Sequence, residues 1–396
     1  MPSPRSPLLV LAGAAALGSF VFCSSLRRST SLPSSDSKAI PSPQRTLLPR
    51  LNDVDIEKLP YPPDALPGGR DVTSPCGTIR VYEWGPEDGK KVLLIHGIST
   101  PCIALAGVAY RLVDRGCRVM LFDLFSRGYS SGPSPSTHNY DSCLYNAQIL
   151  FVLHSSPLGW TSAPITLVGY SLGGALAADF TFYFPSLVHE LILVASGGLI
   201  RAKHISWKSS ILYSTAGLLP DWVQESLVAR RLWTGPQSAR SIEPDPKDVP
   251  EEKGSERRGG LNSQAVYRSS EMGLLDGNEN STVGKVVDWQ ILHHEGFVKA
   301  FISSIQHAPI HGQQHCWGVI GERLKQGSWP LIKVHLIVGR NDPIIIPEEV
   351  EEDAKSILGE EFVTVEIVEG SGHEIPIERP DVIATAVCNA LVKRTS

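Results

Sequence analysis

The chain has 396 residues, enough for one α/β core with an insertion, and its 42% hydrophobic and 19% charged residues are typical of a globular protein. This composition excludes a collagen-like or wholly disordered chain. The formal net charge is −5 at pH 7, and acidic and basic residues are intermixed. Because there is no basic stripe to neutralise a phosphate backbone, we expect no nucleic-acid partner.

The first element in chain order is an apolar run over residues 8–26, bounded by Arg5 and by Arg27-Arg28. Its length is close to the roughly 20 residues that span the hydrocarbon of a bilayer as a helix. The run predicts a single-pass membrane anchor over residues 1–28. A cleaved signal peptide and an inert leader are the alternatives, the former because small residues lie near the end of the run.

Basic residues are denser after this run than before it, which by the positive-inside rule favours a cytosolic location for the rest of the chain. The seven cysteines agree, because they show no C-x-x-C spacing and their odd number leaves at least one thiol unpaired. We expect most of them to be small buried hydrophobes in a reducing compartment. A secreted or lumenal location is the alternative, and only there would the sequon at Asn280 matter.

Residues 29–71 are rich in serine and proline and predict an extended tether, so that the folded domain begins near Val72. From there, strand-like segments alternate with helical ones. Residues 79–84 alternate in polarity, and apolar runs typical of strands covered on both faces recur at residues 92–95, 118–122, 165–168, 191–194 and 334–338. This alternation predicts a mostly parallel sheet with helices on both faces.

In such sheets, ligands bind beyond the carboxyl ends of the strands, so the residues that follow the apolar runs are the candidates for a site. The side chains that follow five of the expected strands are those of His96, Asp123, Ser171, Asp342 and His373. They include the three residue types needed for nucleophilic catalysis by a serine.

The segment Gly169-Tyr170-Ser171-Leu172-Gly173 has the pattern Gly-x-Ser-x-Gly between an expected strand and an expected helix. In this context the serine sits on a sharp turn, and the glycines let neighbouring backbone pass close by. The pattern predicts that Ser171 is a nucleophile and that Gly169 and Gly173 are required by the turn.

A serine hydroxyl is a weak nucleophile at neutral pH, so a histidine must accept its proton and a carboxylate must orient that histidine. His373 lies in a glycine-flanked loop after a last expected strand that ends at Val368, and Asp342 follows the strand at 334–338. Both come after Ser171 in the order serine, acid, histidine. We therefore expect Ser171, Asp342 and His373 to form a catalytic triad.

A tetrahedral oxyanion needs two backbone N–H donors, one after the nucleophile and one from an earlier strand-end loop. These positions are filled by Leu172 and Ile98. His96 lies in the same loop, and we expect its ring to brace that loop by hydrogen bonds rather than to act as the base.

These ordered motifs resemble those of the α/β-hydrolase superfamily, particularly its monoacylglycerol-lipase-like and small esterase members. The resemblance covers about residues 72–391. It implies an eight-stranded, mostly parallel sheet with a helical cap inserted after the sixth strand, and ester or lipid substrates. The core is then expected at residues 72–198 and 331–396. One departure is the loop from Asp123 to Gly128, which is longer than the family's Asp-x-Arg-Gly spacing and bears on loop shape.

The expected cap spans residues 199–330, where helical segments carry bulky residues such as Trp207, Trp222 and Leu232. Helical periodicity does not tell whether these bulky residues line an acyl pocket or form the cap's own core. Within it, residues 243–260 are charged and rich in proline and glycine, which predicts a disordered loop. Residues 300–320 are expected to form a helical return to the core. The histidines between 293 and 315 show no ligand spacing, so we expect no metal.

Together these features predict a serine hydrolase without a cofactor that cleaves carboxylic esters of apolar acyl substrates through an acyl-enzyme on Ser171. The expected partners are a small apolar ester or lipid and the membrane that holds the N-terminal segment. An acyltransferase, thioesterase or lactone-forming enzyme with the same triad is the alternative. A non-catalytic binding module is a further one, because fold alone does not establish activity. The sequence does not indicate the oligomeric state.

Overall fold

The computed structural model describes residues 39–204, 207–233, 270–327 and 329–392. The anchor expected over residues 1–28 and the insertion at 243–260 lie outside these ranges, and both stay predictions. Among the helices within the described ranges, none combines the length and the apolar character needed to cross a membrane.

Eight strands form one sheet in the order β1-β2-β4-β3-β5-β6-β7-β8. β2 pairs with β1 and β4 in antiparallel orientation, and all other neighbours are parallel. Each apolar run of the sequence coincides with a strand, which confirms the predicted mostly parallel sheet. The strands are β1 (Gly69–Ser74), β2 (Gly77–Trp84), β3 (Lys90–Ile95), β4 (Cys117–Phe122), β5 (Ile165–Tyr170), β6 (Val188–Val194), β7 (Val334–Gly339) and β8 (Val363–Val368).

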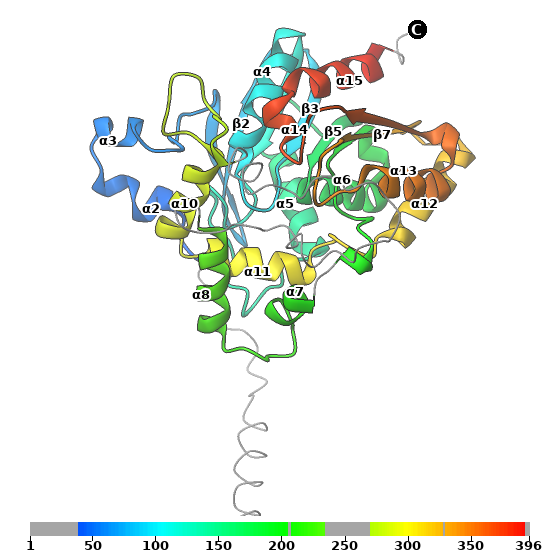
Figure 1. The fold of residues 1–396 in the computed structure, drawn as a ribbon. Coiled ribbons are helices and arrows are strands. Elements are labelled where there is room, and N and C mark those ends of the chain that lie inside the picture. The colour runs from blue at the N-terminus through cyan, green and yellow to red at the C-terminus, as the bar shows by residue number, and fades with distance from the viewer. Residues whose placement is uncertain (1–38, 205–206, 234–269, 328, 393–396) are drawn as a thin grey trace, which may run out of the picture. The chain divides into compact units, whose positions relative to one another are not determined.

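Helices cover both faces of the sheet (Figure 1). On one face, α4 packs against α15, and on the other α5, α6, α12 and α13 form a row. β5 is buried along its whole length, as expected for a strand covered on both faces. These helices are α4 (Ala106–Asp114), α5 (Ser142–His154), α6 (Leu172–Tyr183), α12 (Gln314–Gln326), α13 (Pro347–Leu358) and α15 (Pro380–Val392).

The chain before β2 differs from the expected extended tether. From residue 39 onward it contains the short helices α2 (Pro43–Thr46) and α3 (Asp53–Glu57) and the edge strand β1, and the side chain of Tyr61 is completely buried. The proline-rich composition does not reveal this, because the burial depends on contacts with residues far along the chain. β1 also lacks an apolar run, since it alternates between exposed and half-buried residues.

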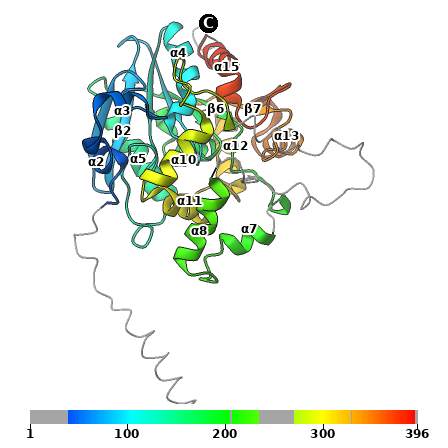
Figure 2. The ribbon, with the colours of Figure 1, turned by 60° about the vertical axis from the view of Figure 1, so that its left-hand side comes forward.

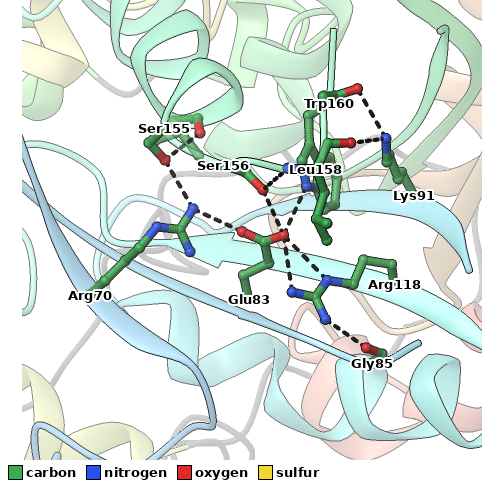
Figure 3. Close-up of polar contacts among 11 residues, drawn as sticks. Arg70, Glu83, Gly85, Lys91, Arg118, Ser155, Ser156, Leu158 and Trp160 are labelled. Atoms are coloured by element: carbon green, nitrogen blue, oxygen red, sulfur yellow. Dashed lines mark hydrogen bonds and ion pairs between the residues drawn. The ribbon is translucent and has the colours of Figure 1, made fainter. Parts of the chain in front are cut away.

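A buried carboxylate ties β2 to the loop after α5 (Figure 3). Glu83 lies on β2, and its oxygens accept hydrogen bonds from Ser156 Oγ at 2.9 Å and Trp160 Nε1 at 3.0 Å. Arg70 and Arg118 form ion pairs with the same carboxylate at 2.9 and 3.2 Å. The antiparallel edge of the sheet is thereby joined to the covering loop by charge and by directed hydrogen bonds.

Between β6 and β7 the described chain is helical. The helices that precede α12 there are α7 (Trp207–Leu212), α8 (Asp221–Leu232), α10 (Val283–His293) and α11 (Phe297–His307). α8, α10 and α11 lie side by side (Figure 2) and share their own hydrophobic cluster, which consists of Val228, Leu232, Val287, Phe297, Phe301 and Ile302.

The bulky residues of this segment therefore have different environments. Leu232 is buried in the helices' own cluster, whereas Trp222 is 72% exposed. The helical return expected over residues 300–320 is two helices, α11 and α12, because the chain between them contains Pro309 and a left-handed Gly312 with φ of 70°.

Candidate active site

Ser171 stands on a strained turn between β5 and α6. Its backbone has φ of 54° and ψ of −117°, in a region that residues other than glycine rarely adopt. The flanking glycines are required by close packing. A Cβ atom on Gly173 would lie 2.1 Å from the carbonyl oxygen of Ile95, and one on Gly169 would lie 2.3 Å from that of Gly173. The structure therefore has the sharp strand-to-helix turn that the Gly-x-Ser-x-Gly pattern predicts.

The structure brings Ser171, His373 and Asp342 together from the ends of three strands. His373 Nε2 lies 3.0 Å from Ser171 Oγ, and His373 Nδ1 lies 2.8 Å from Asp342 Oδ2. The Asp342 side chain is inaccessible to solvent, and its other oxygen accepts the backbone N–H groups of Ile344 at 2.8 Å and Ile345 at 2.9 Å. These bonds fix the carboxylate, so the geometry is that of a serine activated by an oriented histidine.

The loops that carry Asp342 and His373 support each other. β7 and β8 are parallel neighbours, and Gly339 is paired with Val368 at their carboxyl ends. Beyond this point the Asn341 N–H donates to the Ser371 carbonyl at 3.0 Å. The two residues therefore meet because adjacent parallel strands end at the same edge of the sheet.

The loop after β3 lies against the nucleophile. A Cβ atom on Gly97 would lie 3.3 Å from Ser171 Cβ, so this backbone approaches the serine closely. The His96 ring braces the loop, as expected: Leu124 N–H donates to its Nε2 at 2.8 Å, which leaves Nδ1 to donate to the Gly97 carbonyl at 2.7 Å. Burial, together with Arg127, lowers the pKa of His96 to about 3, so the ring is neutral.

This bracing also sets the direction of the expected oxyanion donor. The Gly97 carbonyl and the Ile98 N–H belong to one planar trans peptide, so they point in opposite directions. Because His96 holds the carbonyl, the Ile98 N–H is directed away from that ring. Leu172, the second expected donor, opens α6 directly after Ser171.

Two buried side chains that the sequence pattern did not single out also hold this loop. Arg127 is inaccessible to solvent, and its Nε donates to the Ile98 carbonyl at 2.7 Å. Gln290, on α10, donates to the Ser99 carbonyl at 2.9 Å and accepts from the Gly128 N–H at 2.9 Å. The longer loop from Asp123 to Gly128 supplies Arg127, but no local pattern indicates that α10 would reach this position.

A further pair lies beside His373. Tyr170 Oη donates to Glu374 Oε2 at 2.5 Å, and the rings of Tyr170 and His373 have their centroids 5.5 Å apart. In the sequence, Tyr170 precedes Ser171 and Glu374 follows His373. This adjacency is the sequence signal that indicates the pair.

One of the histidines considered as metal ligands, His294, has other partners in the structure. His294 Nε2 donates to the Ser130 carbonyl at 2.9 Å, and its Nδ1 accepts the Gly296 N–H at 3.2 Å. In the described part of the chain, no group of three His, Cys, Asp or Glu side chains is arranged to hold a metal ion.

Comparison with known proteins gives relatives that match part of the chain. An uncharacterized protein of Mycobacterium tuberculosis is 33% identical over 124 residues, which cover 31% of this chain and 34% of that protein. A serine hydrolase-like protein of Danio rerio is 27% identical over 131 residues, which cover 32% and 37% of the two chains. The chain thus matches about a third of the length of these curated relatives.

Solved structures resemble more of the chain. A membrane phospholipase A has a TM-score of 0.57 at 19% identity, with 98% of this chain and 96% of that chain covered. A carboxylesterase from Bacillus subtilis has a TM-score of 0.53 at 16% identity, with 82% and 90% covered. At these identities the likeness establishes the shared fold.

The profile of the Alpha/beta hydrolase family matches residues 92–386, from β3 to α15. This range is well over half of the chain and includes Ser171, Asp342 and His373. The fold, with its eight-stranded and mostly parallel sheet, agrees with the match. The chain therefore belongs to the alpha/beta hydrolase family.

Proposed function

We propose that this protein is a serine ester hydrolase in which Ser171 is the nucleophile, His373 the general base and acid, and Asp342 the group that orients His373. The observation that carries the proposal is the continuous set of contacts from Ser171 Oγ to His373 Nε2 at 3.0 Å and from His373 Nδ1 to Asp342 at 2.8 Å. A module that only binds ligands does not need this alignment on a strained turn.

The reaction begins when Ser171 Oγ attacks the ester carbonyl while His373 Nε2 takes its proton. The resulting oxyanion is stabilised by the N–H groups of Leu172 and Ile98. His373 then gives the proton to the departing alkoxide, which leaves as an alcohol, and an acyl-enzyme remains on Ser171. A water molecule then attacks the acyl carbon while His373 takes one of its protons. As the bond to Ser171 Oγ breaks, His373 returns this proton to Oγ, and the carboxylic acid leaves.

An apolar acyl group is the substrate class that the surroundings favour. Ile98 packs both against the sheet's hydrophobic core and against the cluster shared by α8, α10 and α11. The proposed oxyanion donor therefore has apolar side chains beside it, while Arg127 bonds to its carbonyl oxygen. Ligand sites for apolar groups are lined mainly by apolar side chains in this way. We propose esters similar to monoacylglycerols, or small lipophilic esters, as substrates.

The test is covalent labelling with a fluorophosphonate probe, which reacts with an activated serine. We expect labelling of the wild type, loss of labelling in Ser171→Ala, and retention in Ser196→Ala. Ser196 is a matched control because it also follows a strand of the sheet and is buried, but its hydroxyl bonds to the Gly197 carbonyl. A wild-type protein that takes up no probe contradicts the proposal.

A further inference from the structure

We propose that Tyr170 and Glu374 form a positioning pair that holds His373 at its distance from Ser171. The pair rests on the proposed function, since it acts through the proposed base. Its basis is one bond between the two sides of the site: Tyr170 Oη, beside the nucleophile, donates to Glu374 Oε2, beside the histidine, at 2.5 Å.

The Tyr170 ring fills the space between the oxyanion loop and the histidine. The ring is only 4% exposed, and its centroid lies 5.5 Å from that of His373 at an interplanar angle of 44°. On its other side, a Cβ atom on Gly97 would lie 3.2 Å from Tyr170 Cε1. The ring therefore contacts both neighbouring parts of the site and limits how far His373 can move toward Gly97.

Glu374 anchors the chain on the far side of His373. On the near side, Ser371 is fixed by its carbonyl bond to the Asn341 N–H, and Gly372 N–H donates to Glu378 Oε2 at 3.3 Å. On the far side, Glu374 precedes the short helix α14 (Ile375–Glu378). The N–H groups of Ile377 and Glu378 donate to the Glu374 carbonyl at 3.0 Å, so the bond from Tyr170 ties the start of this helix to the nucleophile's side of the site.

The direction of the bond is set by the chemistry of the two groups. Burial, followed by the negative charge of Glu374, raises the pKa of Tyr170 well above its ordinary value, so the hydroxyl keeps its proton. A neutral hydroxyl that donates to a carboxylate makes a charge-assisted bond, which is short and directional. An amide oxygen at position 374 would still accept from the hydroxyl, but an alanine or a phenylalanine in the pair would abolish the bond.

The experiment is a double-mutant cycle in the full chain with a chromogenic short-chain ester. We expect kcat in Tyr170→Phe and in Glu374→Ala to fall by about 10- to 100-fold, because displacements of the order of 1 Å have effects of this size. KM should change little, since neither residue is proposed to bind substrate. The double variant should be no slower than the slower single variant, and Glu374→Gln should keep most of the wild-type kcat.

Tyr82→Phe is the matched control, because Tyr82 is fully buried and donates one hydroxyl bond, at 3.0 Å to the Pro63 carbonyl, without contact to the proposed triad. Its kcat should equal that of the wild type. The thermal midpoint of every variant is measured alongside kcat, so that a loss of folding is recognised.

Several outcomes overturn the positioning pair: unchanged kcat in folded Tyr170→Phe and Glu374→Ala, multiplicative losses in the double variant, or a Glu374→Gln variant as slow as Glu374→Ala. In each of these cases, a wild type that hydrolyses the ester and takes up fluorophosphonate keeps the proposed function intact. A wild type without either activity removes the proposed function itself.

Discussion

Two buried histidines are held neutral by their surroundings, and neither belongs to the proposed triad. His96 is inaccessible to solvent and His294 is 2% exposed. Burial, helped by the charge of Arg127, lowers the pKa of His96 to about 3 and that of His294 to about 4. In both rings, one nitrogen accepts a backbone N–H, so a second ring proton would break that bond.

Because of these two histidines, we expect the free energy of unfolding to decrease as the pH falls. Their folded-state pKa values lie below the ordinary value of about 6.5, so the unfolded chain binds more protons at mildly acid pH. Their contribution to stability is therefore complete above about pH 6.5 and is lost as the pH falls toward the folded-state values.

The measurement is urea unfolding of the wild type and of His294→Gln between pH 7 and pH 4.5. As the pH falls, the free energy of unfolding of the wild type should decrease more steeply than that of His294→Gln. Near pH 5 the two slopes should differ by about 1 kcal/mol per pH unit. His138→Gln is the control, because that side chain lies on an exposed loop. Equal slopes for the wild type and His294→Gln would show that His294 titrates alike in both states.

At the scale of elements, the Glu83 cluster joins β2 to the loop after α5. Burial favours the neutral form of this carboxyl, but the hydrogen bonds from Trp160 and Ser156 and the charges of Arg70 and Arg118 outweigh burial and lower its pKa. The carboxylate therefore stabilises the fold above its unfolded pKa, and this contribution is lost as the pH falls through the folded value.

Glu83→Gln should lower the free energy of unfolding by about 3 kcal/mol at pH 7, because it leaves two arginines without their buried partner. The difference from the wild type should shrink as the pH falls below the ordinary glutamate pKa of about 4.3 and through the lowered folded-state value, because the wild-type carboxyl then also becomes neutral. Denaturant unfolding at several pH values measures this. Glu322→Gln, on the surface of α12 with a side chain that is 67% exposed, should change stability by less than about 0.5 kcal/mol. A pH-independent difference at Glu83 contradicts the argument.

The elements that the sequence predicted well are those whose signal is local. The apolar runs of β3, β5 and β7 appear in the structure nearly at their predicted positions, because most residues of a strand covered on both faces are apolar. β1 was not predicted, since it lies at the edge and alternates between exposed and half-buried residues. The break between α11 and α12 was also missed, although Pro309 marks it.

At the scale of the whole molecule, residues 39–68 connect the core to the helices between β6 and β7. Tyr61 Oη donates to Asp123 Oδ2 at 3.2 Å, and its ring lies edge-on to Trp289 of α10, with centroids 6.3 Å apart. Asn278 Nδ2 donates to the Leu59 carbonyl at 3.2 Å. This segment is therefore part of the packed domain.

A chain that begins at residue 69 should consequently be much less stable than one that begins at residue 39, although both contain β1. The shorter chain loses the burial of Tyr61 and Leu66 and leaves Asp123 without the Tyr61 hydroxyl. We expect a loss of roughly 5 kcal/mol and a thermal midpoint lower by at least about 10 °C. Calorimetry of the two chains checks this, and equal midpoints would make residues 39–68 a tether after all.

The sequence by itself determined the class of sheet, the strained turn at Ser171 and the order of the candidate residues Ser171, Asp342 and His373. These depend on local properties: the polarity of a strand, the need for glycine where backbones nearly touch, and the position of a residue just after a strand. The tertiary structure decided what depends on distant parts of the chain. Only there do Arg127 and Gln290 reach the loop of Ile98, because the partners of a buried polar group are fixed by packing rather than by neighbours in the sequence.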